Sequence, residues 1–179
     1  YCSSTTFSYS NSSTSIQTIV YNVVPSFLNC TGNNFTVEVT VYPSAQVFFS
    51  GPNQTICNTT DSALINLSST TAGNVTFNWT ANVPTGISGA VLSGTDSIPI
   101  QTLTNSTTNP LTVSYTAIAT FTNNGYSCQG PPTIYTITVN PTILASAVLS
   151  NYNGYGVSVF GNSDGFVNVS VTGGSGSYT

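Results

Sequence analysis

The chain has 179 residues with no Lys, Arg or His and four acidic residues, so that 2% of it is charged, against about a quarter in a typical soluble protein. This composition excludes an imidazole base, a lysine nucleophile and a basic site for phosphate. It also argues against nucleic-acid binding, which depends on Lys and Arg. No apolar run reaches the ~18 residues that a membrane-spanning helix needs. The 39% of hydrophobic residues suffices for a core, which suits a structural or adhesive protein.

The first predicted elements are two strands that recur later in the chain. Residues 35–43 (FTVEVTVYP) alternate polar and apolar side chains, and residues 133–141 (TIYTITVNP) repeat them at a spacing of 98. Residues 19–27 resemble residues 113–121 in the same way. Both copies therefore predict one hairpin: a strand, an Asn/Gly-rich loop with a cysteine, and a strand that ends at Pro43 or Pro141. Because proline cannot continue a ladder, we expect module boundaries there.

The second copy predicts an all-β domain. Its strands are expected at Ala45–Ser50, Ser62–Ser68, Asn74–Ala81, Ala90–Leu92, Ser97–Leu103, Leu111–Phe121 and Thr133–Asn140. Seven short strands in about a hundred residues are typical of an immunoglobulin-like β-sandwich. Trp79, the single tryptophan, lies in an apolar strand and is expected to anchor the core rather than to stack on a sugar at the surface.

The outer segments look incomplete, as if cut from a longer protein. Residues 1–43 carry the start and the end of a module but not its middle, so this copy is either a short variant or lacks residues between Cys2 and Cys30. Residues 142–179 predict a hairpin of Tyr155–Phe160 and Gly165–Thr172 around an Asp-Gly turn. We therefore expect three domains: 1–43 as a partial sandwich, 44–141 as a complete one, and 142–179 as the N-terminal part of a third module.

The cysteines, Cys2, Cys30, Cys57 and Cys128, are even in number and indicate disulfides in an oxidising, extracellular setting. Four cysteines allow three pairings. We expect Cys2–Cys30 and Cys57–Cys128, because each pair holds the same place in its copy of the repeat.

We expect no catalytic residue, metal or cofactor. No cysteine has a histidine to activate it, and nothing in the spacing of Asp61 and Asp96 suggests a glycosidase pair. Calcium needs clustered oxygen ligands, and Asp164 in its turn has no acidic neighbour.

Two families resemble the chain. Residues 142–179, with the turn Gly161-Asn162-x-Asp164-Gly165 and the later VTGGSGSY, are similar to the SprB-type repeat of giant surface adhesins of gliding Bacteroidota. Residues 44–141 resemble the PKD-like domains that accompany such repeats. The shared pattern is Ile56-Cys57, Phe77-x-Trp79, Ile87-Ser-Gly89 and Cys128-x-Gly130. The resemblance implies an exported, modular protein of the cell surface, delivered by type IX secretion.

That setting adds a candidate modification. Asp61-Ser62-Ala63 and Asp96-Ser97-Ile98 fit the Asp-Ser-aliphatic pattern of O-glycosylation in Bacteroidota, which makes Ser62 and Ser97 candidate glycan sites. The alternative is that each aspartate only caps a turn.

The sequence thus favours a disulfide-stabilised spacer in a long extracellular adhesin or filament, acting in adhesion or gliding, with neighbouring modules as its partners. A second hypothesis is a module that binds surface polysaccharide through exposed Tyr9, Tyr126, Tyr152 and Tyr155. A third is a sheath subunit that pairs with other copies of itself, because the charges that normally protect strand edges are missing.

Overall fold

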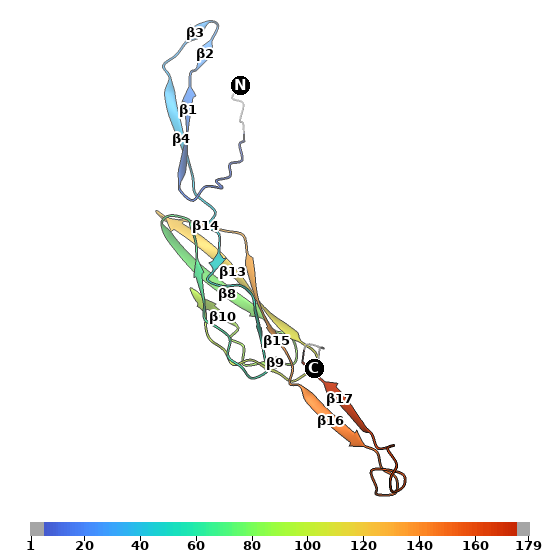
Figure 1. The fold of residues 1–179 in the computed structure, drawn as a ribbon. Helices are drawn as coiled ribbons and strands as arrows, with labels where there is room; N and C mark the ends of the chain where they lie inside the picture. The colour runs from blue at the N-terminus through green and yellow to red at the C-terminus, as the bar shows by residue number, and fades with distance from the viewer. Residues whose placement is uncertain (1–5, 175–179) are drawn as a thin grey trace.

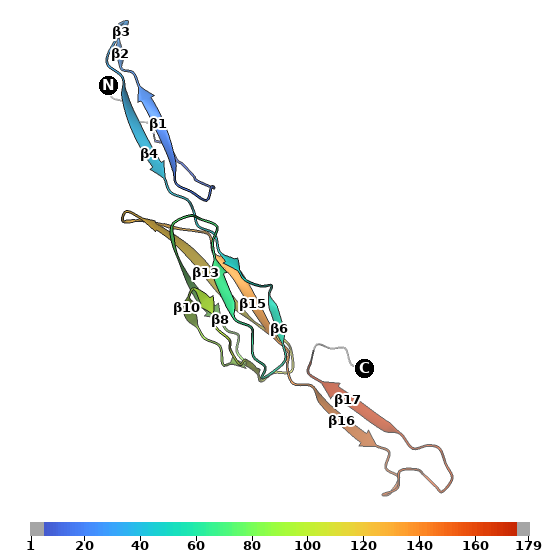
Figure 2. The same cartoon turned by 60° about the vertical axis from the view of Figure 1, so that its left-hand side comes forward.

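The computed structural model describes residues 6–174, and it confirms the expected all-β fold. None of these residues lies in a helix that is long and apolar enough to span a membrane. The molecule is elongated: a hairpin, a sandwich and a second hairpin follow one another from end to end (Figures 1 and 2).

The middle part consists of two packed sheets. The larger sheet has the order β10-β8-β13-β15-β6, formed by Ser93–Thr95, Asn74–Asn82, Leu111–Asn123, Thr133–Val139 and Gln54–Ile56; β14 (Tyr126–Gln129) pairs with the end of β13. The smaller sheet has the order β11-β7-β5, formed by Ser97–Ile98, Ile65–Ser68 and Phe48–Phe49. A short pair, β9 (Ile87–Ser88) and β12 (Thr104–Asn105), closes one end.

The core lies between these sheets, because every second side chain of each long strand points inward. The larger sheet buries Trp79, Val113, Tyr115, Ala117, Ala119, Phe121, Tyr135, Ile137 and Val139. The other layer and its loops bury Ala45, Val47, Ile65, Leu67, Ile98 and Leu103. The central pair β13 and β15 contributes most to this core.

The first hairpin repeats that central pair. Strands β1 (Gln17–Val23) and β4 (Phe35–Val41) are antiparallel and pair Tyr21 with Val37, just as β13 and β15 pair Tyr115 with Tyr135. The continuation β2 (Ser26–Phe27) and β3 (Cys30–Thr31) pairs Phe27 with Cys30, as Phe121 pairs with Cys128. The prediction of one hairpin in both copies is therefore confirmed.

The extra residues of the second copy lengthen its ladder. Two further pairs extend β13 and β14, and Asn124 and Gly125 close the turn with φ of 46° and 82°. Positive φ at both central residues is the geometry that an Asn-Gly turn supplies. The inserted segment therefore forms a hairpin tip rather than a longer loop.

Two predicted strand assignments are wrong. Ala90–Leu92 is a connection between β9 and β10, in which the Leu92 carbonyl accepts a hydrogen bond from Ala81. In the last module, β17 (Val167–Thr172) pairs with β16 (Leu144–Leu149), and residues 155–160 form turns within the loop that joins them. The run Leu144–Leu149 contains no glycine, whereas the other run, of equal length, is broken at Gly156.

The buried tyrosines predict an alkaline limit to stability. Burial raises the pKa of Tyr115 and of Tyr135, and each phenol stays neutral in the fold at a pH where the unfolded chain ionises. The unfolded chain then binds fewer protons, so stability is complete below its tyrosine pKa of about 10 and falls as the pH rises above it. Melting curves between pH 7 and 12 should show this decline, and Tyr135→Phe should make it shallower. A variant profile with the wild-type slope would contradict the assignment.

Candidate functional site

Two joints, one on each side of the sandwich, connect the three parts of the molecule. At the first, Tyr42 follows β4 and stacks on Tyr126, with ring centroids 5.5 Å apart and planes at 26°. Its ring also lies 6.0 Å from that of Phe121, which is itself in the core. The last side chain of the first hairpin thus belongs in part to the sandwich.

The backbone after Tyr42 is held against the sandwich. Pro43 and Ala45 are buried, and Ala45 is 0% exposed. A Cβ at Gly130 would lie 1.5 Å from the Ala45 carbonyl oxygen, so only glycine permits this contact between the linker and the β14–β15 connection. The Gly130 N–H donates to the Ala119 carbonyl at 2.8 Å, which fixes the connection on β13.

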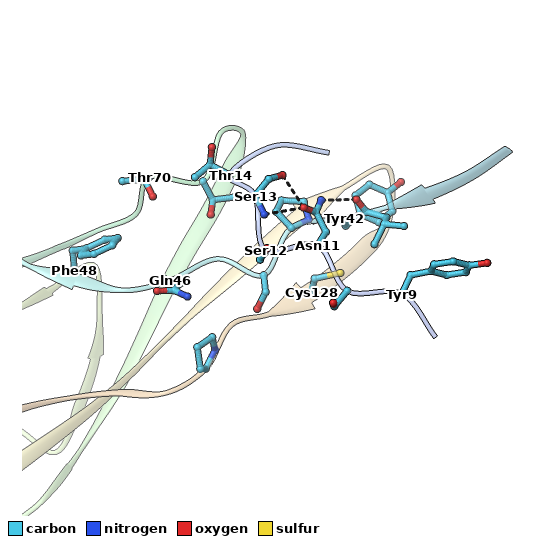
Figure 3. A pocket seen from close by; sticks show the side chains of 16 residues that line it. Tyr9, Asn11, Ser12, Ser13, Thr14, Tyr42, Gln46, Phe48, Thr70 and Cys128 are labelled. Carbon is cyan, nitrogen blue, oxygen red and sulfur yellow. Dashed lines mark hydrogen bonds between the residues drawn. The ribbon is translucent and has the colours of Figure 1, made fainter. Parts of the chain in front are cut away.

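The segment before β1 adds a second link. Its Thr14 carbonyl accepts a hydrogen bond of 2.8 Å from the Ala72 N–H of the sandwich. The Asn11 side chain donates to the Val41 and Ser15 carbonyls, both at 2.8 Å, and so ties this segment to the end of β4. Between segment and sandwich lies a cleft of about 600 Å³ lined by hydroxyls, amides and aromatic rings, together with Cys128 (Figure 3).

The second joint, at Pro141, is shorter. Asn58 donates its side-chain amide to the Thr142 hydroxyl at 2.7 Å, and Asn140 donates its N–H to the Ile56 carbonyl at 2.9 Å. From the far strand, Gly174 donates to the Pro141 carbonyl at 3.3 Å. A Cβ at Gly173 would lie 2.0 Å from the Thr142 carbonyl oxygen, so the two ends of the last hairpin approach each other closely at this joint.

The acidic residues do not gather. Asp61 accepts a hydrogen bond from the Thr102 hydroxyl at 2.5 Å. Asp164 accepts hydrogen bonds from the hydroxyl and the N–H of Ser158, which lower the pKa of its carboxyl. Within residues 6–174, no three His, Cys, Asp or Glu side chains come together as a metal site. The contacts that hold the two joints are made by neutral groups.

The aromatic candidates lie apart from one another. Trp79 is 2% exposed, donates its indole N–H to the Ser97 carbonyl at 2.9 Å and meets the Tyr115 ring edge-on. Tyr9 lies on the first hairpin and Tyr126 at the first joint, whereas Tyr152 and Tyr155 lie in the far loop. The four tyrosines proposed for sugar stacking thus occupy three separate places and do not form one platform.

The expected disulfide between Cys57 and Cys128 is absent, which corrects that sequence-based pairing. Cys57 and Cys128 are free thiols. Cys57 directly follows Ile56. Ile56 pairs with Val139, which in turn pairs with Leu111 at the start of β13. Cys128 pairs with Phe121, toward the other end of β13. That separation is roughly 30 Å at ~3.3 Å per residue, and a disulfide needs Cα atoms within about 7 Å.

Cys30 is also a free, exposed thiol, at the tip of the first hairpin. Its expected partner Cys2 lies outside the described residues. Cys30 and Cys128 are equivalent positions, but each faces a phenylalanine across its ladder rather than a second sulfur.

The two candidate glycan sites differ in access. Ser62 is 3% exposed, and its hydroxyl accepts a hydrogen bond from the Gln101 N–H at 3.1 Å. A sugar there would have to displace this buried contact, so we expect Ser62 to be unmodified in the folded chain. Ser97 is half-buried in β11 next to Asp96, whose φ of 59° places it in a turn. Glycosylation of Ser97 stays a prediction.

The sequence placed module boundaries at Pro43 and Pro141 but did not reveal the contacts that hold the joints. Tyr42, Asn11 and Gly130 make the decisive contacts, and of these only Gly130 belongs to a quoted motif. One local signal existed: an aromatic residue directly before the boundary proline, in Tyr42-Pro43. Gly130 stood out only as part of the Cys128-x-Gly130 pattern, and not as a contact point.

The comparison with protein families agrees with this architecture. The sequence model of the PKD-like domain family matches residues 3–45 and 54–143, which together exceed half of the chain. No curated protein matches the chain. PKD-like domains are immunoglobulin-type sandwiches that are usually extracellular and typically non-catalytic, and they suggest a structural or adhesion-type module. With both copies of the repeat covered by this match, the chain belongs to the family of PKD-like domains.

Proposed function

We propose that the chain is a spacer region of a long extracellular surface adhesin or filament. The observation that carries this proposal is the end-to-end order of the three parts, each joined to the next by buried prolines and backbone hydrogen bonds (Figure 2). A spacer needs a fixed length and an inert surface. The joints, which are made of neutral groups, fix the length, and a chain with 2% charged residues presents an inert surface. The proposal needs no Cys57–Cys128 disulfide, because packing at the joints holds the parts together.

The adhesin context rests on the resemblance of residues 142–179 to SprB-type repeats. This resemblance supports a location on the surface of a gliding bacterium, after export by type IX secretion. The nearest partners would be other modules of the same chain. Surface polysaccharide is a weaker candidate partner, because the exposed tyrosines are scattered along the molecule.

Small-angle scattering tests the spacer. The strands of the three parts, laid end to end at ~3.3 Å per residue, span roughly 85 Å, and a rod of that length has a radius of gyration of about 25–30 Å. A compact chain of this size would give about 16 Å and an unfolded one about 45 Å. We therefore expect a value near 27 Å, with the cross-section of a single sandwich. A radius near 16 Å would show that the parts fold back on one another and would contradict the spacer.

A further inference from the structure

The cleft at the first joint has two walls, and hydrogen bonds hold both in place. One wall is the segment before β1, where the Asn11 side chain donates to the Val41 carbonyl at 2.8 Å and accepts from the Ser13 hydroxyl at 2.7 Å (Figure 3). The other wall belongs to the sandwich: the linker, β5 and the connection between β7 and β8. The Ala72 N–H donates to the Thr14 carbonyl at 2.8 Å and so ties one wall to the other.

Thr71 is the residue of this cleft that points to a ligand. It lines the cleft although it is only 9% exposed. Its backbone is fixed, because its N–H donates to the Ser69 hydroxyl at 3.2 Å and the N–H of the next residue donates to Thr14. The Thr71 hydroxyl itself makes no hydrogen bond to any other group in residues 6–174.

A hydroxyl that is nine-tenths buried and lacks a protein partner destabilises a fold unless another molecule bonds to it. Among the described residues, no side-chain nitrogen or oxygen is both inaccessible and unpartnered. The Thr71 hydroxyl therefore stays accessible, and its access is through the cleft that Thr71 lines. The side chains of Gln46 and Ser12 line the same cleft and also make no hydrogen bond within residues 6–174. Both walls thus offer unused polar groups to a ligand.

The charge of the lining argues for a neutral ligand. The chain has no Lys, Arg or His, so no side chain can form an ion pair with phosphate, sulfate or a carboxylate. None of the four acidic residues lines the cleft, so no carboxylate there can bind a cation. The lining consists instead of hydroxyls and amides, which both donate and accept hydrogen bonds, and of the rings of Tyr9, Tyr42 and Phe48.

A saccharide and a peptide are the two neutral ligands to compare. Peptides are usually recognised by addition to a sheet edge, in an apolar groove, or on a Pro-binding groove lined by aromatic rings. In this cleft, nine of the 16 lining residues carry a hydroxyl, and most of them lie outside strands. Hydroxyls and amides match the many hydroxyls of a sugar, and the aromatic rings offer an apolar surface for its C–H groups. The lining therefore favours a saccharide.

We propose that this cleft binds a neutral saccharide, with the Thr71 hydroxyl and the Gln46 amide bonding to sugar hydroxyls. Its volume of about 600 Å³ lies in the range of about 300–1,000 Å³ that is usual for ligand sites. A ligand there touches both walls, so its binding also holds the segment before β1 on the sandwich. This goes beyond the spacer role, which needs no ligand, and it does not depend on the scattered tyrosines.

Titration with neutral oligosaccharides tests the site. The probes are cellopentaose, xylopentaose, mannopentaose and maltopentaose, and pentagalacturonate serves as the charged counterpart. Amide shifts in the NMR spectrum of the whole chain are followed up to about 10 mM ligand, because an open cleft should bind with a dissociation constant on the order of 0.1–1 mM. We expect at least one neutral probe to shift the amides of Gln46, Thr71 and Ala72, and the charged probe to shift none of them.

Two variants remove the unused polar groups without touching the joint contacts. Thr71→Val deletes the hydroxyl and should weaken binding roughly fivefold to tenfold, and Gln46→Ala should act in the same direction. Neither should lower the melting temperature, because neither side chain has a hydrogen bond within the described chain to lose. Thr76→Val is the matched control: Thr76 is exposed on β8, outside the cleft, and this variant should bind like the wild type.

The absence of a shift with every neutral probe would overturn the proposal, as would wild-type affinity in both Thr71→Val and Gln46→Ala. A lower melting temperature for Thr71→Val would show that its hydroxyl is bonded within the protein, which removes the argument for a ligand. Shifts at the same amides from a neutral Ser/Asn-rich pentapeptide, with none from the saccharides, would assign the cleft to peptides instead. The length measured by scattering does not depend on a ligand, so this proposal and the spacer can fail separately.

Discussion

Trp79→Ala should destabilise the protein by about 3–5 kcal/mol, the usual cost of removing a large aromatic ring from a core. The indole is 2% exposed and lies against Tyr115, with centroids 5.6 Å apart. Gly94 of the neighbouring strand lies directly on the ring: a Cβ there would come within 2.6 Å of it. Because backbone at Gly94 lines one side of the ring, we expect the cavity left by its removal to persist. Urea unfolding followed by circular dichroism would measure the loss.

Two variants separate the ring from its hydrogen bond. Trp79→Phe keeps most of the ring but removes the N–H that donates to the Ser97 carbonyl, and it should cost about 1–3 kcal/mol. Ile100→Ala removes an apolar side chain that is 61% exposed and should change stability little. If Trp79→Ala cost no more than Ile100→Ala, Trp79 would not anchor this core.

The strands of the sandwich were predictable because their side chains alternate. Strands 111–123 and 133–139 bury every second residue, and the apolar pattern alone revealed this. The repeat went further and predicted that β1 and β4 pair as β13 and β15 do. Pairing register was visible because two copies of the same hairpin supported each other.

The pairing in the last module was not predictable in this way. Three apolar runs compete there: residues 144–149, 155–160 and 165–172. The sequence favoured pairing of the last two, because only a short turn separates them. Closing the longer loop of residues 150–166 costs only roughly 1 kcal/mol more than a short turn, because loop entropy grows with the logarithm of length. Neither β16 nor β17 is buried, so local contacts decide this pairing. Ser150 helps to close the observed loop: its hydroxyl accepts a hydrogen bond from the Phe166 N–H and donates one to the Gly156 carbonyl.

The cysteines show what the repeat could predict and what it could not. Equivalent positions predicted correctly that Cys30 and Cys128 lie at the same place in their hairpins. They could not tell that β6 runs parallel to β15 and so carries Cys57 to the far end of the sandwich. The positions of the joints were predicted from Pro43 and Pro141, but their contacts were missed, because these join residues far apart in sequence, such as Ala45 and Gly130.

Gly130→Ala should loosen the first joint, which the proposed spacer depends on. The new Cβ would lie 1.5 Å from the Ala45 carbonyl oxygen, and neither backbone can move easily. Ala45 is fully buried, and Gly130 is held by its hydrogen bond to Ala119. The strain should cost about 1–3 kcal/mol and be relieved by lifting the linker off the sandwich. Tyr42 would then leave its stack on Tyr126.

Scattering and proteolysis can follow this change. We expect Gly130→Ala to broaden the distribution of lengths in scattering and to expose the bond before Val47, which is buried in the linker, to thermolysin. Cleavage there should be at least tenfold faster, because about 1.4 kcal/mol corresponds to a factor of ten. Gly156→Ala is the matched control: its Cβ meets nothing within 4 Å, and it lies in the far loop. If both variants were cleaved at the wild-type rate, the close contact at Gly130 would not hold the joint. The rigidity of the spacer would then have to come from the hydrogen bonds of Asn11 and Thr14 alone.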